Sequence, residues 1–454
     1  MVSIASSILK NNWKVQSLLN SQVRVGVIGA GVFGTMMIVQ LARMRGLKPA
    51  IIADINLKYA TQALELAQTR QNQIIEVTTV SQANATMDEQ KIVVTPDANV
   101  LVQSDIHIVV EATGNAEVGS QYAYKALMNK KHLVLVNVET DALVGPILQR
   151  LAENSNLHYS LAYGDQPALI KELYDWANTL DLEIIAAGKG ARYTPAFRRN
   201  TPDDALQTYG FDHTLIQKIH PNSKMYNSFI DGTKSAVEMV SVSNMTGLKP
   251  DIRGMHFPTA RIHEIPDKLR LQKDGGILHH EHVVEVVSSL TEDGTEVHPN
   301  LRHGVYLVFR SPNGHIQQLA GMYCDRKHAD IAFTYRPYHF TGIEAPISVA
   351  KIAFENTCTG YPIGWYSDVL AAAKKDLAPG ELLDGGGGYT VYGLAADTCV
   401  SRKAHFLPIG LANGVRVKHR IAADEMLTYD DVDLDEASFS LQLRRMQEST
   451  IQPS

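Results

Sequence analysis

The stretch VRVGVIGAGVFGTMMI, at residues 23–38, is the most informative part of the chain. An apolar run ends at Gly29, and three glycines with G-x-G-x-x-G spacing lead into a segment with helical periodicity. The stretch IIAD, at residues 51–54, is typical of a second strand that ends in an acid. A strand, a glycine turn, a helix and then such an acid together predict a dinucleotide-binding βαβ unit. A glycine-rich turn of another α/β fold is the weaker alternative, because it would not need the acid.

The three glycines have separate roles in this interpretation. Gly29 permits the tight turn, Gly31 lets the backbone approach a pyrophosphate, and Gly34 lets the helix pack closely on the strand. Two later strands end in small polar turns that would place backbone beside a nicotinamide ribose. The predicted cofactor-binding residues are Gly29, Ala30, Gly31, Val32, Phe33, Gly34, Asp54, Lys58, Thr113, Gly114 and Asn137.

Asp54 bears on the choice between NADH and NADPH. An acid at the end of the second strand normally accepts hydrogen bonds from a ribose 2′-OH and repels a 2′-phosphate, which favours NADH. Lys58 lies four residues later and would offset this charge if Asp54 turned away. The residues alone therefore leave both cofactors open.

The composition is that of an ordinary soluble protein. The 454 residues carry a formal charge of −6, and 45% are hydrophobic. Because no basic excess is available for a polyphosphate backbone, we expect no nucleic-acid partner. The three cysteines are scattered without C-x-x-C spacing, which fits a reducing compartment. Since no run of 18 apolar residues and no signal-peptide pattern occurs, we expect a cytoplasmic protein without a membrane partner.

Alternating strand and helix patterns over residues 23–185 predict an α/β fold with a doubly wound, Rossmann-type parallel sheet. The expected strands are 23–28, 50–54, 92–95, 106–111, 133–137 and 182–186, and residues 1–20 have helical character. We expect three domains. They are an NAD(P)-binding Rossmann domain at 1–186, an α+β substrate, catalytic and dimerisation domain at 187–355, and a small β-rich domain with a tail at 356–454.

The segment GKGARYTPAFRR, at residues 188–199, follows the last expected strand of the nucleotide domain. We therefore expect it to run toward the reactive end of the cofactor. Lys189 lies between two glycines and is a candidate catalytic residue. Arg192, Arg198 and Arg199 are candidates for binding a substrate phosphate or carboxylate through their planar forks. By composition alone, a solvated basic loop is an equally good interpretation.

The segment NSFIDGTKSAVE, at residues 227–238, has helical periodicity. Asn227, Asp231, Lys234 and Glu238 are spaced so that one helix would carry all four on a single face. We predict that Asn227, Asp231 and Lys234 are catalytic, with the Asp231 carboxylate and the Lys234 ammonium in general acid–base roles, and that Glu238 binds substrate. A surface row of ion pairs is at least as good an interpretation.

Two other patterns are weaker. The histidines in the middle of the chain show no H-E-x-x-H or comparable pattern, so the sequence predicts no located metal site. Those that we considered are His256, His263, His279, His280, His282 and His303. The four glycines at 385–388 could cradle a phosphate. No strand-to-helix switch follows them, so a turn is the better interpretation.

Together, the glycine fingerprint, the Lys189 segment, YNSFIDGTKS at 226–235 and the C-terminal module resemble one family across nearly the whole chain. It is the bacterial deoxyxylulose-phosphate reductoisomerase-like family, which is similar in fold to homoserine dehydrogenases. The stretches PGE at 379–381 and LPIG at 407–410 are similar to those of a SAF domain, a small β-rich module. The segment at 226–235 is the more diagnostic of these resemblances.

The resemblance implies a reaction in isoprenoid precursor biosynthesis. In that family, an NADPH-dependent enzyme rearranges 1-deoxy-D-xylulose 5-phosphate and reduces the product to 2-C-methyl-D-erythritol 4-phosphate. On this resemblance we expect NADPH as the cofactor, with NADH as the alternative. The wider class uses a divalent cation to chelate two substrate oxygens, and we see no dedicated ligand set for it in this sequence. The resemblance also implies a homodimer and a small phosphorylated sugar or sugar acid as substrate.

Two other functions stay open. The chain could be an NAD(P)-dependent dehydrogenase or oxidoisomerase of homoserine or a branched sugar acid, since relatives carry such activities. It could also be a non-catalytic nucleotide-sensing or assembly protein, which would bind the cofactor without turning over a substrate.

Overall fold

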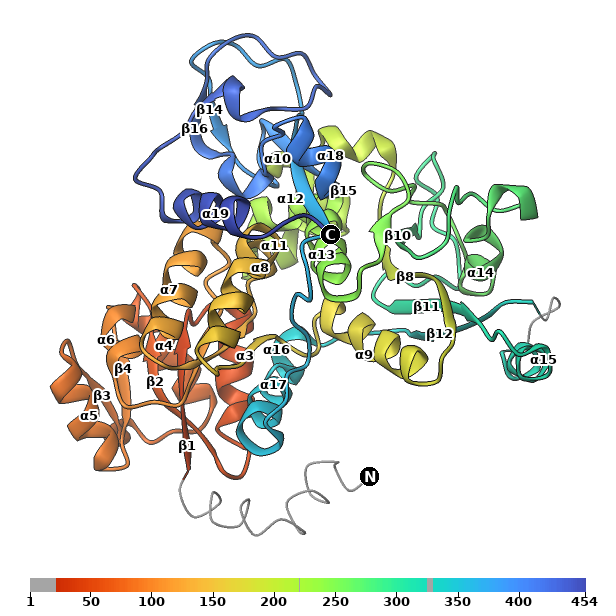
Figure 1. Cartoon of the computed structure of the whole chain (residues 1–454). Coiled ribbons are helices and arrows are strands. Elements are labelled where there is room, and N and C mark those ends of the chain that lie inside the picture. Colours follow the sequence, from red (N-terminus) through yellow and green to blue (C-terminus); the bar gives the residue numbers. More distant parts are fainter. Residues whose placement is uncertain (1–21, 220, 325–329) are drawn as a thin grey trace. The chain divides into compact units, whose positions relative to one another are not determined.

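The computed structural model describes residues 22–219, 221–324 and 330–454 (Figure 1). The expected helical lead-in at residues 1–20 lies outside these residues. The chain divides into two compact units, each assembled from separated segments. Unit 1 consists of Met1–Asn137, Leu148–Asp165 and Phe340–Tyr361, and unit 2 consists of Val138–Ile147, Gln166–His339 and Pro362–Ser454.

Unit 1 contains a seven-stranded sheet in the order β3-β4-β2-β1-β5-β6-β7, with parallel pairing throughout. The strands are β1 (Val23–Ile28), β2 (Leu47–Ala53), β3 (Ile74–Glu76), β4 (Ile92–Thr95), β5 (Ile108–Glu111), β6 (His132–Leu135) and β7 (Tyr159–Leu161). The helices are α3 (Val32–Leu41), α4 (Leu57–Leu66), α5 (Val80–Asp88), α6 (Ala98–Gln103) and α7 (Ala116–Met128), while α8 (Val138–Asn154) begins in unit 2. The prediction of a Rossmann-type α/β fold is confirmed.

The order of the strands places a topological switch next to β1. From β1 the chain continues to β2 on one side, and β5 lies on the other side of β1. Ligands of open α/β sheets bind at such a switch, beyond the carboxyl ends of the strands. The glycine turn follows the carboxyl end of β1 and therefore lies at this place.

A late segment of the chain completes the core of unit 1. Helices α16 (Thr341–Glu344) and α17 (Pro346–Ala350) pack against α3, as Figure 1 shows. Ala345, Val349 and Ile352 belong to the same buried cluster as the apolar residues of β1 and α3. The predicted continuous domain at 1–186 therefore differs from unit 1, which takes part of its core from residues some three hundred positions after β1.

Unit 2 contains a five-stranded mixed sheet in the order β12-β11-β8-β10-β9. Its strands are β8 (Glu183–Ala191), β9 (Lys249–Pro250), β10 (Val283–Ser288), β11 (Val305–Arg310) and β12 (Ala332–Arg336). β8 pairs in parallel with β10 and antiparallel with β11. The expectation that residues 182–186 form the last strand of the nucleotide sheet is therefore wrong. The short β7 is the last strand of that sheet, and β8 lies in the middle of the other one.

Helices surround this sheet. α9 (Gln166–Thr179) and α13 (Thr233–Thr246) pack on each other and on the sheet. The remaining helices of the first part of unit 2 are α10 (Pro202–Tyr209), α11 (His213–Ile219), α12 (Ser223–Ile230), α14 (Ile265–Lys268) and α15 (Gly314–Tyr323).

The C-terminal part is rich in short strands, as the sequence predicts. β13 (Ser367–Ala373) pairs with β15 (Val391–Asp397), and β14 (Leu382–Asp384), β16 (Asn413–Val417) and β17 (Val432–Asp433) form a three-stranded sheet. α13 packs against β13 and β15. These strands, with α18 (Thr398–Lys403) and α19 (Phe439–Thr450), belong to the same compact unit as β8. In the described part of the chain, no helix combines the length and the apolar character that crossing a bilayer requires.

Candidate functional site

The glycine turn of unit 1 has two crowded glycines and one open glycine. Gly29 has a φ of +93°, and a Cβ atom there would lie 2.8 Å from the carbonyl oxygen of Ala112. A Cβ atom on Gly34 would overlap the carbonyl oxygen of Gly29. A Cβ atom on Gly31 would meet nothing within 4 Å. The backbone at Gly31 therefore faces open space, as the close approach of a pyrophosphate requires.

The N-terminus of α3 is suited to an anion. Gly31 is its N-cap residue and, as a glycine, has no side chain that could accept a hydrogen bond from the first turn of the helix. The first N–H groups of a helix have no partner inside the helix, and the helix dipole favours negative charge there. Val32 and Phe33 begin this turn, so the predicted phosphate-binding residues are contiguous.

Asp54 turns toward the glycine turn. Its Oδ2 accepts a hydrogen bond of 2.8 Å from the backbone N–H of Ala30, and its Oδ1 accepts one of 2.8 Å from Asn56 N–H. Lys58 is exposed in the first turn of α4. The carboxylate is thus fixed beside the turn, which is the arrangement that the sequence associates with NADH.

The carboxyl ends of β5 and β6 complete the predicted cofactor site. Thr113 donates its backbone N–H to the buried Glu111 Oε1 over 2.8 Å, and Gly114 has a φ of +68°. Asn137 donates its side-chain amide to the carbonyl oxygen of Asn115 over 3.0 Å. Because β5 and β6 are neighbours in the sheet, these turns lie at the same edge as the glycine turn. Unit 1 thus brings the predicted cofactor residues together.

The segment at residues 227–238 was expected to place its polar side chains on one face of one helix. In the structure it belongs to two helices, so this expectation is wrong. α12 ends at Ile230, and α13 begins at Thr233. Between them Gly232 adopts a φ of +88°, a left-handed conformation that interrupts the helix. Asn227 lies on α12 and Asp231 is its C-cap, whereas Lys234 and Glu238 lie on α13. The spacing of the four polar residues therefore does not align them.

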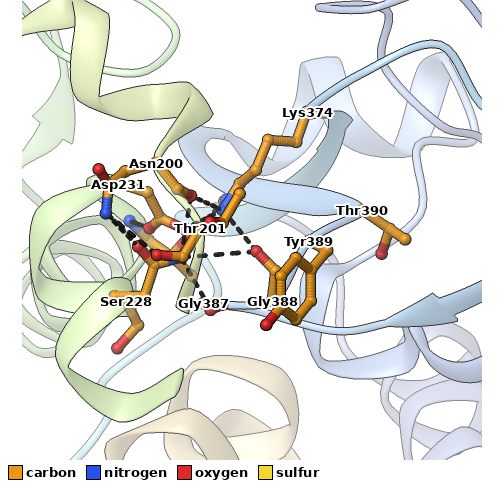
Figure 2. A network of polar contacts seen from close by, with 12 residues as sticks. Asn200, Thr201, Ser228, Asp231, Lys374, Gly387, Gly388, Tyr389 and Thr390 are labelled. Atoms are coloured by element: carbon orange, nitrogen blue, oxygen red, sulfur yellow. Dashed lines mark hydrogen bonds and ion pairs between the residues drawn. The ribbon is translucent and has the colours of Figure 1, made fainter. Parts of the chain in front are cut away.

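Asn227 and Asp231 belong to a buried polar network around Lys374 (Figure 2). The Lys374 ammonium donates to Asp231 Oδ2 over 2.8 Å, to the carbonyl oxygen of Gly388 over 2.7 Å and to that of Asn200 over 2.9 Å. The Asn227 amide donates to the carbonyl oxygens of Asn200 and of Gly387 over 3.0 and 2.9 Å. This network fastens the C-terminal part of unit 2 to α12.

The network is closed to solvent. The side chain of Lys374 is 2% exposed and that of Asp231 is not exposed at all. Burial raises the pKa of the Asp231 carboxyl, and the charge of Lys374 opposes this shift. The second oxygen of Asp231 accepts the backbone N–H of Thr233. With their atoms occupied in this way, Asn227 and Asp231 are suited to positioning α12 and α13.

The glycines at 385–388 form a packed turn within this network. The carbonyl oxygens of Gly387 and Gly388 face the donors of Asn227 and Lys374. A Cβ atom on Gly387 would overlap the carbonyl oxygen of Lys224. Since its carbonyl oxygens point to cations and amides, this turn does not have the arrangement of an anion cradle.

Two further lysines of unit 2 form separate ion pairs. Lys189, on β8, pairs with Glu238, and both side chains are less than a tenth exposed. Lys234, on α13, pairs with Glu139 over 2.6 Å, and these side chains are 17% and 34% exposed. Lys234 pairs with Glu139 and Asp231 pairs with Lys374, so these two predicted catalytic residues have different described partners. Of the two pairs, only the one formed by Lys234 and Glu139 is accessible enough to meet a substrate.

The three predicted phosphate-binding arginines have three different partners. Arg192 approaches Glu296 at 3.4 Å, Arg198 donates to the Tyr193 hydroxyl over 2.7 Å, and Arg199 pairs with Asp424 over 2.6 Å. Burial raises the pKa of Tyr193, and Arg198 opposes this shift. The described contacts therefore do not gather the three guanidinium groups around one ligand.

Sequence reasoning missed two residues of these pairs. Lys374 lies next to Lys375 in an AKKD stretch, and nothing local distinguishes the buried lysine from the exposed one. Glu139 carries a clearer signal, because it follows Asn137 by two positions at the end of a predicted strand. A charged residue at that place on a switch-point edge is a candidate for the site.

Unit 2 also holds a buried carboxyl group that no motif indicates. Glu285, on β10, accepts hydrogen bonds from the backbone N–H groups of His256, Phe257 and Val286. Burial raises the pKa of Glu285 to about 7, although these hydrogen bonds oppose the shift. The group fixes the backbone after β9, where Met255 and Phe257 have positive φ values.

A comparison with known protein families indicates an oxidoreductase. Residues 164–345 match the family model described as "Oxidoreductase DRL, catalytic domain". This match covers β8, Lys189, α12 and α13. It confirms the prediction of an oxidoreductase enzyme. No curated protein sequence matches the chain significantly.

Solved structures with a similar arrangement are distant. A "probable dehydrogenase" from Thermotoga maritima is 9% identical, with 74% of this chain and 90% of that chain covered and a TM-score of 0.38. Scyllo-inositol dehydrogenase from Lactobacillus casei, with bound NAD(H) and scyllo-inositol, is 13% identical, with 63% and 73% covered and a TM-score of 0.32. An oxidoreductase from Agrobacterium radiobacter, in complex with NAD+, L-tartaric acid and magnesium, is 11% identical, with 74% and 88% covered and a TM-score of 0.36.

Proposed function

We propose that this oxidoreductase uses a nicotinamide dinucleotide to oxidise a hydroxyl group of a small hydroxylated substrate to a carbonyl group, or to reduce such a carbonyl group to a hydroxyl group. The observation that carries the proposal is the ion pair of Lys234 and Glu139 at 2.6 Å. Glu139 follows Asn137 by two positions, and Asn137 is at the strand end that we assign to the cofactor. Chain connectivity alone keeps these two α-carbons within about 8 Å of each other.

Lys234 is the proposed proton donor. Reduction of a carbonyl needs a proton at the substrate oxygen, and a positioned ammonium supplies it as a general acid. The Glu139 carboxylate orients this ammonium and stabilises its charge. When bound, the nicotinamide would supply or accept the hydride. In the oxidation direction, the Lys234 amine would take the proton of the hydroxyl group.

The other predicted catalytic residues have supporting roles in this proposal. Lys189 and Glu238 form a buried pair between β8 and α13, which would hold α13 against the sheet. Asn227 and Asp231 would fix the junction of α12 and α13 through Lys374. We therefore treat these four as positioning residues and Lys234 as the catalytic residue.

For the cofactor we favour NADH over NADPH. The resemblance implies NADPH, but the Asp54 carboxylate is held beside the glycine turn by Ala30 and Asn56. A 2′-phosphate on the adenosine ribose would meet this negative charge. Lys58 makes no described ion pair with Asp54 that would cancel it.

Two substrates compete within this proposal. The resemblance supports 1-deoxy-D-xylulose 5-phosphate, and the product would then be 2-C-methyl-D-erythritol 4-phosphate. The separate partners of Arg192, Arg198 and Arg199 favour the second candidate, a dehydrogenase or oxidoisomerase of an unphosphorylated sugar acid or of homoserine. In a phosphate site built from these arginines, the acidic partners of Arg192 and Arg199 would compete with the phosphate for the guanidinium groups.

The test combines a substrate panel with one matched pair of variants. Absorbance of the reduced nicotinamide reports turnover of the phosphorylated sugar, of branched sugar acids and of homoserine with each cofactor. Lys234→Met should lower kcat by about 100-fold or more and leave cofactor affinity unchanged. Lys249→Met is the control, because Lys249 also forms a partly exposed ion pair, with Asp397 over 2.9 Å. Normal turnover in Lys234→Met would remove Lys234 from catalysis.

A further inference from the structure

Three imidazole groups surround one carboxylate in unit 2. Asp251 Oδ2 lies 2.6 Å from His256 Nε2 and 2.9 Å from His279 Nδ1. Asp251 Oδ1 lies 2.9 Å from His280 Nδ1. The Asp251 side chain is fully buried, whereas those of His279 and His280 are more than half exposed. Neither the proposed cofactor site nor the lysine pairs use these residues.

The fold brings the four residues together from two neighbouring strands. Asp251 follows β9 directly, and His279 and His280 lie shortly before β10, which pairs in parallel with β9. Glu285 accepts the backbone N–H of His256 over 2.9 Å and so fixes the loop after β9. The carboxylate of Asp251 is itself held by the backbone N–H groups of His279 and His280, at 3.0 and 3.2 Å.

The carboxylate of Asp251 faces more donors than it can accept. Three imidazole nitrogens and two backbone N–H groups point at its two oxygens. A carboxylate offers about four lone-pair sites. If two of the imidazole nitrogens gave up their protons to bind a cation, the excess of donors would disappear.

We propose that Asp251, His256 and His279 bind a divalent first-row transition metal ion, with zinc as the best fit. Their ligand atoms all lie within 4.8 Å of one another. Two imidazoles and one carboxylate are a typical three-residue zinc set that leaves a further coordination position for water. His280 would support the site from outside by binding the other oxygen of Asp251.

The ligand atoms of this site favour a different ion from the divalent cation that the family resemblance implies at the substrate. Magnesium prefers oxygen ligands in octahedral geometry, whereas imidazole nitrogens suit zinc and its neighbours in the first row.

Cobalt(II) is the probe for the test, because its visible absorption reports ligand number and geometry. The full chain is treated with a chelator, dialysed and titrated with Co²⁺, and zinc is then added in competition. We expect one cobalt per chain with the spectrum of a nitrogen- and oxygen-ligated site, and displacement by zinc. Absence of saturable binding, or binding at several ions per chain only, would overturn the proposal.

Four variants locate the site. His279→Ala and Asp251→Asn should weaken cobalt binding by about 100-fold or more, and His280→Ala by about 10-fold, as expected for an outer residue. His263→Ala is the control, because His263 is exposed in unit 2 outside the cluster. Circular dichroism verifies folding, and the exposed position of His279 makes its variant the safest one. Equal affinity in His279→Ala and His263→Ala would contradict the assignment.

Discussion

The glycine turn of unit 1 and the Lys374 network of unit 2 are both tightly packed, but they are built in opposite ways. The turn uses six consecutive residues and crowds backbone against backbone at Gly29 and Gly34. The network joins side chains and carbonyl groups from α12 and its C-cap, from Lys374 directly after β13, and from the turn at 385–388. The proposed cofactor site therefore depends on local backbone shape, whereas the support of the predicted catalytic residues depends on charges brought together from distant segments.

The largest expected effect tests the network. Lys374→Met would leave the buried carboxylate of Asp231 without its cation, which typically costs about 3–5 kcal/mol of the free energy of unfolding. Denaturant unfolding measures the loss. Lys375→Met is the control, because the neighbouring Lys375 forms an exposed pair with Glu381, worth about 1 kcal/mol or less. If both variants unfold at the same denaturant concentration, the network is not the support we infer.

Glu285, a second buried ionisable group of unit 2, should make the free energy of unfolding depend on pH. Since burial raises the pKa of Glu285 to about 7, the folded protein holds this proton more tightly than the unfolded chain does. The resulting stabilisation is complete below the unfolded pKa of about 4.3 and is lost as the pH rises through about 7. It amounts to about 4 kcal/mol at most.

Glu285→Gln should remove this dependence, because its amide oxygen can still accept the backbone N–H groups but cannot titrate. Thermal unfolding at a series of pH values between about 4 and 8 measures the effect. The exposed Glu292→Gln serves as the control and should follow the wild type. If the stability of Glu285→Gln depends on pH in the same way as that of the wild type, a group other than Glu285 is responsible.

Two substitutions in the glycine turn should affect different quantities, one the stability of the fold and the other the affinity for the cofactor. Gly34→Ala places a Cβ atom on the carbonyl oxygen of Gly29 and should cost about 1–3 kcal/mol of stability. A Cβ atom at Gly31 would meet no other atom within 4 Å, and Gly31 has a φ of −65°, which other residues also adopt. Gly31→Ala should therefore leave the free energy of unfolding unchanged. Its methyl group would occupy the position of the pyrophosphate, and cofactor affinity should fall by about tenfold or more. Titration calorimetry and melting curves on both variants test this separation, and unchanged cofactor affinity in Gly31→Ala would refute the assigned site.

The smallest expected effect concerns cofactor preference. Asp54→Ser removes the carboxylate beside the turn and should shift the ratio of kcat/KM values toward NADPH by about tenfold. Lys58→Ala is the matched variant and should change this ratio little. A wild type that prefers NADPH, and loses that preference in Lys58→Ala, would reverse our choice of cofactor.

The sequence by itself determined the elements whose signals are local. The strand at 23–28 and the strand at 92–95 have the predicted bounds, because apolar runs bounded by turn residues need no distant partner to be recognised. The glycine spacing likewise predicted the crowded and open positions of the turn, since a helix start and a strand end lie within a few residues. The acid at Asp54 was placed correctly at the end of the second strand.

Only the tertiary structure decided which charges meet. Lys234 pairs with Glu139, which is 95 positions away in the sequence, and Lys374 pairs with Asp231, which is 143 positions away. Helical spacing predicted one face for residues 227–238, but the left-handed Gly232 divides the segment, and packing rather than periodicity selects each partner. The same holds for Asp251 and His279, which no spacing rule connects. Burial makes an unpaired charge costly, so the partner of each buried charge is set by the whole fold and not by its neighbours in the sequence.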